Sequence, residues 1–526
     1  MVPATVKLEC ALQGSAFANP AFSEAFGGSE WVDMTPECRH VAPIVCEYGV
    51  FSDGPTELVS GAGSLSFALD NSDGNAAATR GWYSPLNAQR RGGFDFNIPT
   101  RLRISDGVTE SYKFLGRLAD ILVTPGVSGE QVVHCTALDL MDDYARLPVP
   151  PLATQFTKRG DELLQQILDA LPTELQPANR SIQTSLETHA IAFDRAAEES
   201  MTIREAIYEI CASELATAGF IGTTAAGGGL FVFSNRQAPV LNPLVLHSFV
   251  DDIPRDGLVV PGSRDDLVSK VQVFVHPTRV DTVDVVLYAL ETTATLVNSG
   301  VTNDSLFGPY RDPANPGDRV GGKDMIQPVA TTDYTMNAAQ DGSGANLTAN
   351  FTVTASYTGN GVRFTIINNG ATAGYITKLQ CRGKGIYRFT AVIEKTVPNV
   401  AYGHRVMQID MPYQNNANTG KDVADYLTNV LSRSLSRVTS ITFLANWDAN
   451  VLGAMLSVEP GKRIAITEAV TGLAATEFIV TGVRLEIGSG LLIWCTWYLR
   501  PADTQRYWVL GTAGASELGT VTTLGY

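Results

Sequence analysis

The fold is indicated most clearly by the stretch that begins Arg101-Leu102-Arg103-Ile104, in which charged and apolar side chains alternate with a period of two. Such alternation is typical of a β-strand with one face in a core. Two strand-like runs follow it, and the same order of strand types returns near the end of the chain. The runs are Phe114–Leu118 and Val132–Asp139, and the later set is Arg463–Ile466, Val480–Val483 and Ile493–Leu499. This internal echo predicts two β-barrels of one kind, with chance similarity between two β domains as the alternative.

The β pattern extends through the N-terminal region. Ser64–Leu69 also alternates with a period of two. Helical spacing over Leu138–Leu147 is followed by three prolines between residues 148 and 151, which end a helix. The sequence therefore predicts an N-terminal β-barrel domain over residues 1–150.

Helical patterns follow this boundary. Helices are predicted over Asp161–Leu171 and Ile203–Ala218, the second with Thr202 and Glu205 at capping-box spacing. Together with the strand-like run Leu230–Phe233, these helices predict an α+β module over residues 151–240.

The second half of the chain contains an insertion. Residues 283–396 are rich in Gly, Asn and Thr, with turn sequences at Gly359–Gly361 and Asn368–Gly370, which predicts an inserted β-sandwich. Around it, the strand Lys270–Val275 and a helix over Asp422–Leu435 belong to a predicted second β-barrel domain. This domain takes residues 241–282 and 397–510, and residues 511–526 form a C-terminal tail. The predicted fold class is mainly β, with two tube-like β-barrel domains, a small α+β domain between them and the inserted sandwich.

Composition narrows the possible functions. The 526 residues suggest three or four domains, and the net charge of −16 argues against a protein that coats DNA or an anionic membrane. The first residues carry Lys7 and Glu9, so no secretory signal is expected. The apolar stretch Phe478–Leu499 is broken by Arg484 and Glu486, so no transmembrane helix is expected. The seven cysteines lack C-x-x-C spacing and are interpreted as buried thiols of a protein made in a reducing cytosol: Cys10, Cys38, Cys46, Cys135, Cys211, Cys381 and Cys495.

Several short motifs invite a chemical interpretation. Gly317–Lys323 has phosphate-loop spacing, but Asp324 stands where Ser or Thr would hold magnesium, so an exposed loop is favoured. Gly61–Ser64 is a turn that enters a strand rather than a nucleophile elbow. Asp70–Gly74 hints at a calcium loop but lacks the alternating ligands, which favours a tight hairpin.

Scattered residues give three further weak candidates. The histidines show no zinc-site spacing, although a Cys–His pair that meets only in space stays open: His40, His134, His189, His247, His276 and His404. Acidic groups are formal glycosidase candidates, with turn capping favoured: Asp142-Asp143, Asp251-Asp252, Asp256 and Asp265-Asp266. Aromatic residues offer sugar stacking, with core or subunit contacts favoured: Trp31, Trp82, Tyr83, Trp494, Trp497 and Trp508. No catalytic, cofactor-binding or metal-binding residue is therefore assigned.

The order of motifs along the chain resembles tail-tip proteins of long-tailed bacteriophages, often labelled minor tail proteins. The N-terminal part of this resemblance rests on Trp31–Thr35, Leu65–Gly74, Ser84–Asn87, Arg101–Ile104, Leu115–Leu118 and Ala137–Met141. The C-terminal part rests on Tyr402–Arg405, Asp422–Leu435, Val458–Ile464, Val480–Val483 and Tyr498–Asp503. Together, in this order, these motifs cover most of the chain.

The resemblance implies a structural role without enzymatic activity or cofactor. Such proteins are similar to baseplate hubs, which are homotrimers whose two related β-barrels per chain give a pseudo-sixfold ring. The expected hub joins the hexameric tail tube to the tip and surrounds the channel for genome ejection. Expected partners are a distal tail protein or tail-tube ring, a tape measure protein, tail fibre or receptor-binding proteins, and genomic DNA only in transit. The expected location is the virion tail tip, after synthesis in the host bacterial cytoplasm.

Two other functions stay open. A receptor- or glycan-binding tail protein would act in host attachment through the inserted sandwich, because loops on a rigid scaffold tolerate added modules. A cell-wall hydrolase would need paired carboxylates or metal ligands in a cleft.

Overall fold

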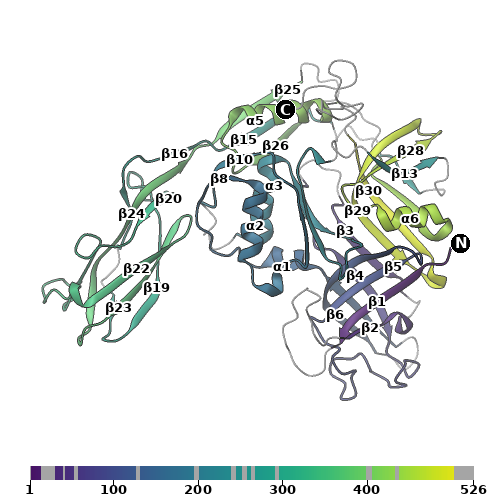
Figure 1. Cartoon of the computed structure of the whole chain (residues 1–526), viewed down its shortest axis with the longest axis horizontal. Coiled ribbons are helices and arrows are strands. Elements are labelled where there is room, and N and C mark those ends of the chain that lie inside the picture. The colour runs from purple at the N-terminus through teal and green to yellow at the C-terminus, as the bar shows by residue number, and fades with distance from the viewer. Residues whose placement is uncertain are drawn as a thin grey trace.

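Strands dominate the structure, a computed structural model (Figure 1). It describes residues 2–12, 30–38, 42–51, 57–125, 131–194, 201–238, 244–250, 257–261, 267–290, 295–397, 405–432 and 438–502. The predicted mainly β class, with a smaller helical component, is confirmed.

The N-terminal β unit is an antiparallel sheet whose strands run in the order β3-β4-β7-β6-β5-β1-β2. Alternating sequence explains it, since in β4 the apolar Leu65, Phe67 and Leu69 are buried. The strands are β1 (Thr5–Leu12), β2 (Glu30–Asp33), β3 (Ile44–Gly49), β4 (Ser64–Asp70), β5 (Pro99–Ser105), β6 (Glu110–Thr124) and β7 (Val132–Leu138).

The C-terminal β unit repeats this order as β14-β27-β30-β29-β28-β13. Its elements are β13 (Val245–Val250), β14 (Leu258–Val259), β27 (Ser440–Leu444), α6 (Ala449–Ser457), β28 (Arg463–Glu468), β29 (Leu473–Ile487) and β30 (Ile493–Pro501). The echo found in the sequence is therefore confirmed in strand order, with a 15-residue strand, β6 or β29, at the same place in each unit. One difference is that β13 runs parallel to β28, whereas β1 runs antiparallel to β5.

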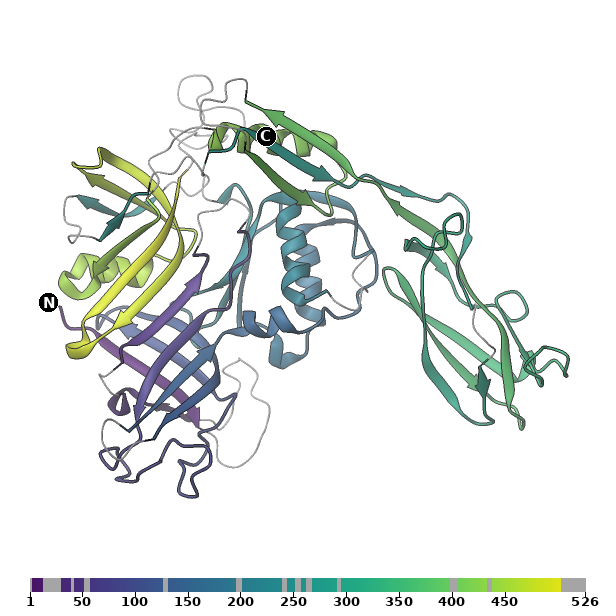
Figure 2. The same cartoon turned by 180° about the vertical axis from the view of Figure 1, so that it is seen from behind.

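The two β units are fused into one 13-stranded sheet with a single hydrophobic core. Beside them lies the α+β module, in which α2 and α3 pack against α1 and a small sheet (Figures 1 and 2). Its elements are α1 (Leu140–Arg146), β8 (Gln155–Arg159), α2 (Gly160–Ala170), β9 (Asn179–Ile182), β10 (Thr188–Ala192), α3 (Ile203–Glu214), β11 (Thr217–Ile221) and β12 (Leu230–Ser234).

Two further bodies lie beyond this module. In the α5 layer, α5 (Ala417–Leu431) covers a sheet of β15 (Lys270–Val275), β25 (Ala391–Thr396) and β26 (Val406–Met411). The arm projects on the side away from the β units and packs two sheets around its own core (Figures 1 and 2). Its strands are β16 (Thr278–Val280), β17 (Val285–Ala289), β18 (Leu296–Val297), β19 (Thr302–Pro309), β20 (Gly321–Ile326), β21 (Tyr334–Asn337), β22 (Phe351–Tyr357), β23 (Gly361–Asn368) and β24 (Gly374–Arg388).

Helix ends differ from the sequence expectations for local reasons. The capping box of α3 is present, with Glu205 N donating to Thr202 Oγ1 at 3.2 Å, but the helix ends at Glu214 because Leu215 is left-handed with φ 56°. Helix α5 begins at Ala417 rather than Asp422, because the Asn416 side chain accepts from Asn418 N and caps the helix there. Residues 433–437, at the predicted end of α5, lie outside the described residues. Helix α6 was not predicted.

The domain ranges predicted from the sequence remain predictions. The hydrophobic cores of the α5 layer and of the arm nevertheless indicate where boundaries would lie. Strands β15 and β26 and helix α5, assigned above to the second barrel, form a core of their own because their apolar faces meet each other. Strand β25 pairs with β15, so the arm's strands span residues 278–388 rather than 283–396. None of the described helices is long and apolar enough to cross a bilayer.

Asp139 links the N-terminal β unit to α1 and is almost fully buried. Its carboxylate caps α1 by accepting from Met141 N at 2.9 Å. Burial raises the pKa of Asp139 to about 7, so the folded chain keeps this proton at a pH where the unfolded chain has released it. The protonated carboxyl of Asp139 therefore makes its whole contribution to stability below the ordinary pKa of an aspartate. This contribution is lost as pH rises to about 7.

We predict that Asp139→Asn, which keeps the cap, removes this dependence. The variant should gain stability relative to the wild type by about 1.4 kcal/mol per pH unit between about pH 4 and 7, and no more above that range. Denaturant titrations of both proteins at several pH values measure this difference. A constant difference across the range would contradict the assignment.

Candidate functional site

The candidate site is the junction at which the two β units become one body. Strand β3 pairs antiparallel with the C-terminal half of β29 over six residue pairs, from Gly49↔Gly482 to Ile44↔Ile487. Cys46 and Leu485 lie opposite each other and are buried in the common core. The next pair, Glu47 and Arg484, forms an ion pair. Apolar packing and charge therefore both fix the register of this joint.

Two glycines allow the backbones to approach at one end of the ladder. Gly49 has φ +98°, and a Cβ there would lie 2.5 Å from the carbonyl oxygen of Thr481. A Cβ on Gly482 would lie 2.7 Å from the carbonyl oxygen of Val50, whose own N–H donates to Thr481 O at 2.8 Å. A side chain at either position would push the two units apart.

A buried ion pair crosses the junction beside this ladder. Lys113, in β6, is fully buried, and its Nζ lies 2.5 Å from Glu459 Oε1. The same Nζ donates to the carbonyl oxygens of Met455 and Leu456 at 2.8 and 3.2 Å. These carbonyls belong to the last turn of α6, where a cation is favoured by the helix dipole. The lysine therefore holds α6 and Glu459 against the N-terminal β unit.

The other oxygen of Glu459 brings in two more elements. Glu459 Oε2 accepts from Tyr48 Oη in β3 at 2.8 Å and from Gly222 N, just after β11, at 3.1 Å. Burial, and then the charge of Glu459, raise the pKa of Tyr48 well above its ordinary value, so this phenol stays a neutral donor. One carboxylate thus connects both β units and the α+β module.

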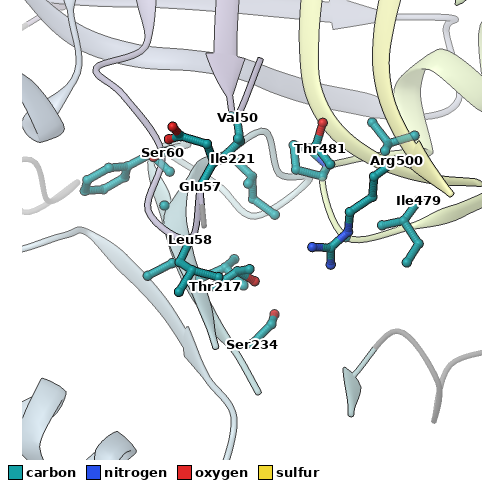
Figure 3. Close-up of a pocket in the computed structure, with 18 residues that line it drawn as sticks. Val50, Glu57, Leu58, Ser60, Thr217, Ile221, Ser234, Ile479, Thr481 and Arg500 are labelled. Carbon is teal, nitrogen blue, oxygen red and sulfur yellow. The ribbon is translucent and has the colours of Figure 1, made fainter. Parts of the chain in front are cut away.

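A cavity of about 80 Å³ lies next to this network (Figure 3). It is lined by the ends of β3 and β11, by the β29 residues Ile479 to Thr481 and by Arg500, which reaches into it. Burial lowers the pKa of Arg500. Glu57 is the other charged lining residue. Since ligand pockets usually measure about 300–1,000 Å³, this space suits a few waters rather than a sugar-sized substrate.

The motif Gly317–Lys323 does not precede a helix in the structure. It leads into β20, where Lys323 Nζ lies 4.7 Å from the Phe156 ring centroid and Asp324 pairs with Lys384 at 2.8 Å. A phosphate loop uses the N–H groups of a helix N-terminus, which this strand does not provide. In Asp70–Gly74, Asp70 Oδ1 accepts from the N–H and hydroxyl of Ser72, which forms a turn.

Among the residues that the structure describes, the candidate histidines and acids do not form a shared site. His134 is exposed, His189 is buried in the α+β module with its pKa lowered by burial to about 4, and His276 lies 2.6 Å from Asp410. His247 packs edge-on against Phe249. Asp142 and Asp143 face Arg146 and Arg117. His40, His404 and the acids Asp251, Asp252, Asp256, Asp265 and Asp266 lie outside the described residues.

Within the described part of the chain, no three His, Cys, Asp or Glu side chains gather as metal ligands. All seven cysteines are free thiols, and six of them are buried. Burial raises the pKa of Cys10, Cys38 and Cys381 to about 12, so these thiols stay protonated and unreactive.

The aromatic candidates serve mainly packing. Trp31 stacks on Arg101, with 3.9 Å between guanidinium carbon and ring centroid, and Arg101 in turn pairs with Glu9. Trp497 and Tyr83 are fully buried. Trp82 packs against the common core, Trp494 is partly exposed and Trp508 lies outside the described residues. The junction residues Lys113 and Glu459 were missed, and the one available signal was a lysine beside the apolar residues Tyr112, Phe114 and Leu115 in a predicted strand.

Comparison with known proteins gives structural similarity at low sequence identity. No protein-family model matches the chain. No curated protein matches it either. The structure is similar to a 43 kDa tail protein of prophage MuSo2 from Shewanella oneidensis, with 10% identity, a TM-score of 0.47 and coverage of 95% of this chain and 99% of that one.

Two other tail proteins show a similar relation. For a tail protein from Neisseria meningitidis the identity is 9%, the TM-score 0.46 and the coverage 95% of this chain and 96% of that one. For prophage tail protein gp18 from Listeria monocytogenes the values are 7%, 0.40, and 94% and 95%. All three are described as tail proteins, the broad class to which the proteins that the sequence motifs resemble belong.

The buried pair yields a direct prediction. Lys113→Met should destabilise the protein by about 3–5 kcal/mol, because Glu459 is left as an unpaired buried charge. Adding Glu459→Gln should recover part of this loss, since a neutral amide still accepts from Tyr48 and Gly222. Arg80→Met is the control, because the pair Arg80–Asp73 is exposed and should contribute only about 0–1 kcal/mol. Denaturant titration measures all three, and equal effects of the Lys113 and Arg80 variants would contradict the assigned role.

Proposed function

We propose that this protein is the structural hub of a bacteriophage tail tip, a homotrimeric ring around the DNA-ejection channel. The observation that carries the proposal is the repeat within the chain: two β units with the same strand order, fused edge to edge. Three such chains supply six similar units. A ring of this kind matches a hexameric tail tube on one face and a threefold tip on the other.

The junction supports this role because a ring must keep its units at a fixed angle. A six-pair ladder, one shared core and the Lys113–Glu459 pair leave little freedom between the two units. The proposed activity is therefore mechanical, and no residue is assigned a catalytic role.

The acidic composition has a use in the same proposal. With a net charge of −16, carboxylates lining the channel would repel passing DNA and prevent adhesion. The proposed neighbours are the distal tail protein or tail-tube ring, the tape measure protein and tail fibre or receptor-binding proteins. The proposed location is the virion.

Native mass measurement tests the hub directly. The purified protein should give a species of three times 56.3 kDa, and this species should not retain DNA at low salt. A monomer at all accessible concentrations would contradict the ring. Salt-sensitive DNA binding by a trimer would contradict the acidic channel.

The arm favours a second, receptor-binding function, because it projects from the rest of the chain (Figure 1). At its base, Asp281 N donates to Gly385 O at 2.9 Å, so a short turn can replace residues 282–384. If the protein is a hub, this deletion should leave the trimer intact. If the arm binds a glycan, the full chain should bind a glycan array and the deletion variant should not. Loss of the trimer on deletion would contradict the hub assignment for the two β units.

A further inference from the structure

The internal repeat can be aligned residue by residue through a shared irregularity. In the β6–β7 ladder the register shifts between Leu118 and Asp120, and in the β29–β30 ladder it shifts between Val480 and Gly482. The extra residue is therefore Ala119 in one unit and Thr481 in the other. Leu118 pairs with Ala137 in β7, and Val480 pairs with Leu499 in β30, so matching the bulges also matches Ala137 with Leu499. One alignment therefore holds for both strands of each hairpin.

This alignment reveals a difference at one strand edge. In β29, residues 482–487 follow the bulge and pair with β3. The equivalent residues in β6 start at Asp120, and residues 120–124 pair with β7 on one side only, because contact with the β5 side ends at Leu118, whose N–H donates to Ile98 O. Among the described residues nothing pairs with the other edge of residues 120–124.

The uncovered edge of β6 is apolar at its centre. Ile121 and Val123 face the core, whereas Leu122 points outward and is 66% exposed. Open edges with apolar side chains readily pair with another strand, and proteins usually protect them. Here the outward neighbours are only Asp120 and Thr124.

The repeat also identifies the strand that fits this edge. Strand β3 pairs with β4 as β14 pairs with β27, with Val45 opposite Ser66 and Val259 opposite Ser440. Strand β3 continues the sheet by pairing with β29, whereas β14 ends it. Val259 and Val260 are 49% and 37% exposed at that end.

We propose that β14 of one copy pairs antiparallel with residues 120–124 of β6 in the next copy. By equivalence with the β3–β29 ladder, Val259 lies opposite Thr124 and Val260 opposite Val123. The contact is head to tail, so it uses a different edge on each copy, and three such contacts close a ring. This inference rests on the proposed trimeric hub and specifies how its copies join.

A disulfide trap in the full-length chain tests the register. Thr124→Cys combined with Val259→Cys places thiols on cross-strand neighbours, whose Cβ atoms lie about 5 Å apart in an antiparallel pair. Oxidation should give covalent dimers and trimers on a non-reducing denaturing gel. Each single variant, and Thr124→Cys with Val470→Cys, should give none of these species, since Val470 lies in the β28–β29 turn and is 94% exposed.

A charge at the edge tests its contribution to assembly. Leu122→Lys should raise the concentration needed for trimers at least tenfold, whereas Val283→Lys, at an equally exposed position near the base of the arm, should not. Circular dichroism verifies that the Leu122→Lys variant is folded. If this variant is unfolded, the disulfide trap alone tests the proposed pairing. A wild-type trimer without cross-linking and without sensitivity to Leu122→Lys would overturn this inference but not the hub. A wild-type monomer would contradict both.

Discussion

The buried contact between Lys113 and Glu459 constrains the body of the molecule. Three parts of the chain meet at this carboxylate: the N-terminal β unit through Lys113 and Tyr48, the α+β module through Gly222, and the C-terminal β unit through Glu459 itself. A buried ion pair adds little net stability compared with apolar packing, but breaking it is costly. Its effect is therefore to allow one mutual arrangement of the three parts and to penalise others. The β3–β29 ladder and its glycines then extend this arrangement over the width of the sheet.

The arm is attached in a different way. Strand β24 runs from the arm towards the α5 layer, and its last residue, Arg388, pairs with the buried Asp194 of the α+β module. Close to this point, Gly359 N donates to Leu152 O. The arm has its own core, so its packing does not depend on the junction. The chain thus contains a β body with one core and an arm that packs around a core of its own.

The sequence predicted local structure well and distant contacts poorly. Alternation in Ser64–Leu69 and the capping box at Thr202 are local signals, and the structure has β4 and α3 there. The start of α5 depended on its cap, Asn416, which lies in an asparagine-rich segment six residues before the first predicted helical position, Asp422. The Lys113–Glu459 contact joins residues 346 positions apart, and nothing in either neighbourhood indicates the other. The echo gave the repeated strand order but no residue-by-residue alignment, which comes from the bulges that match Ala119 with Thr481.

The β29 edge that pairs with β3 and the open edge of β6 carry different side chains. This difference bears on which strand pairs with which edge. At the internal joint, Glu47 lies opposite Arg484 and the two form an ion pair. On the open β6 edge the residue equivalent to Arg484 is Leu122, so β3 placed there would leave Glu47 without its partner. In the segment that contains β14, the position equivalent to Glu47 is Pro261, an uncharged residue that would lie opposite Leu122. Placed on β29, this segment would not replace Glu47 as a partner of Arg484. The Glu47–Arg484 pair therefore favours β3 on β29, and the apolar edge of β6 is left for the contact between copies that we propose.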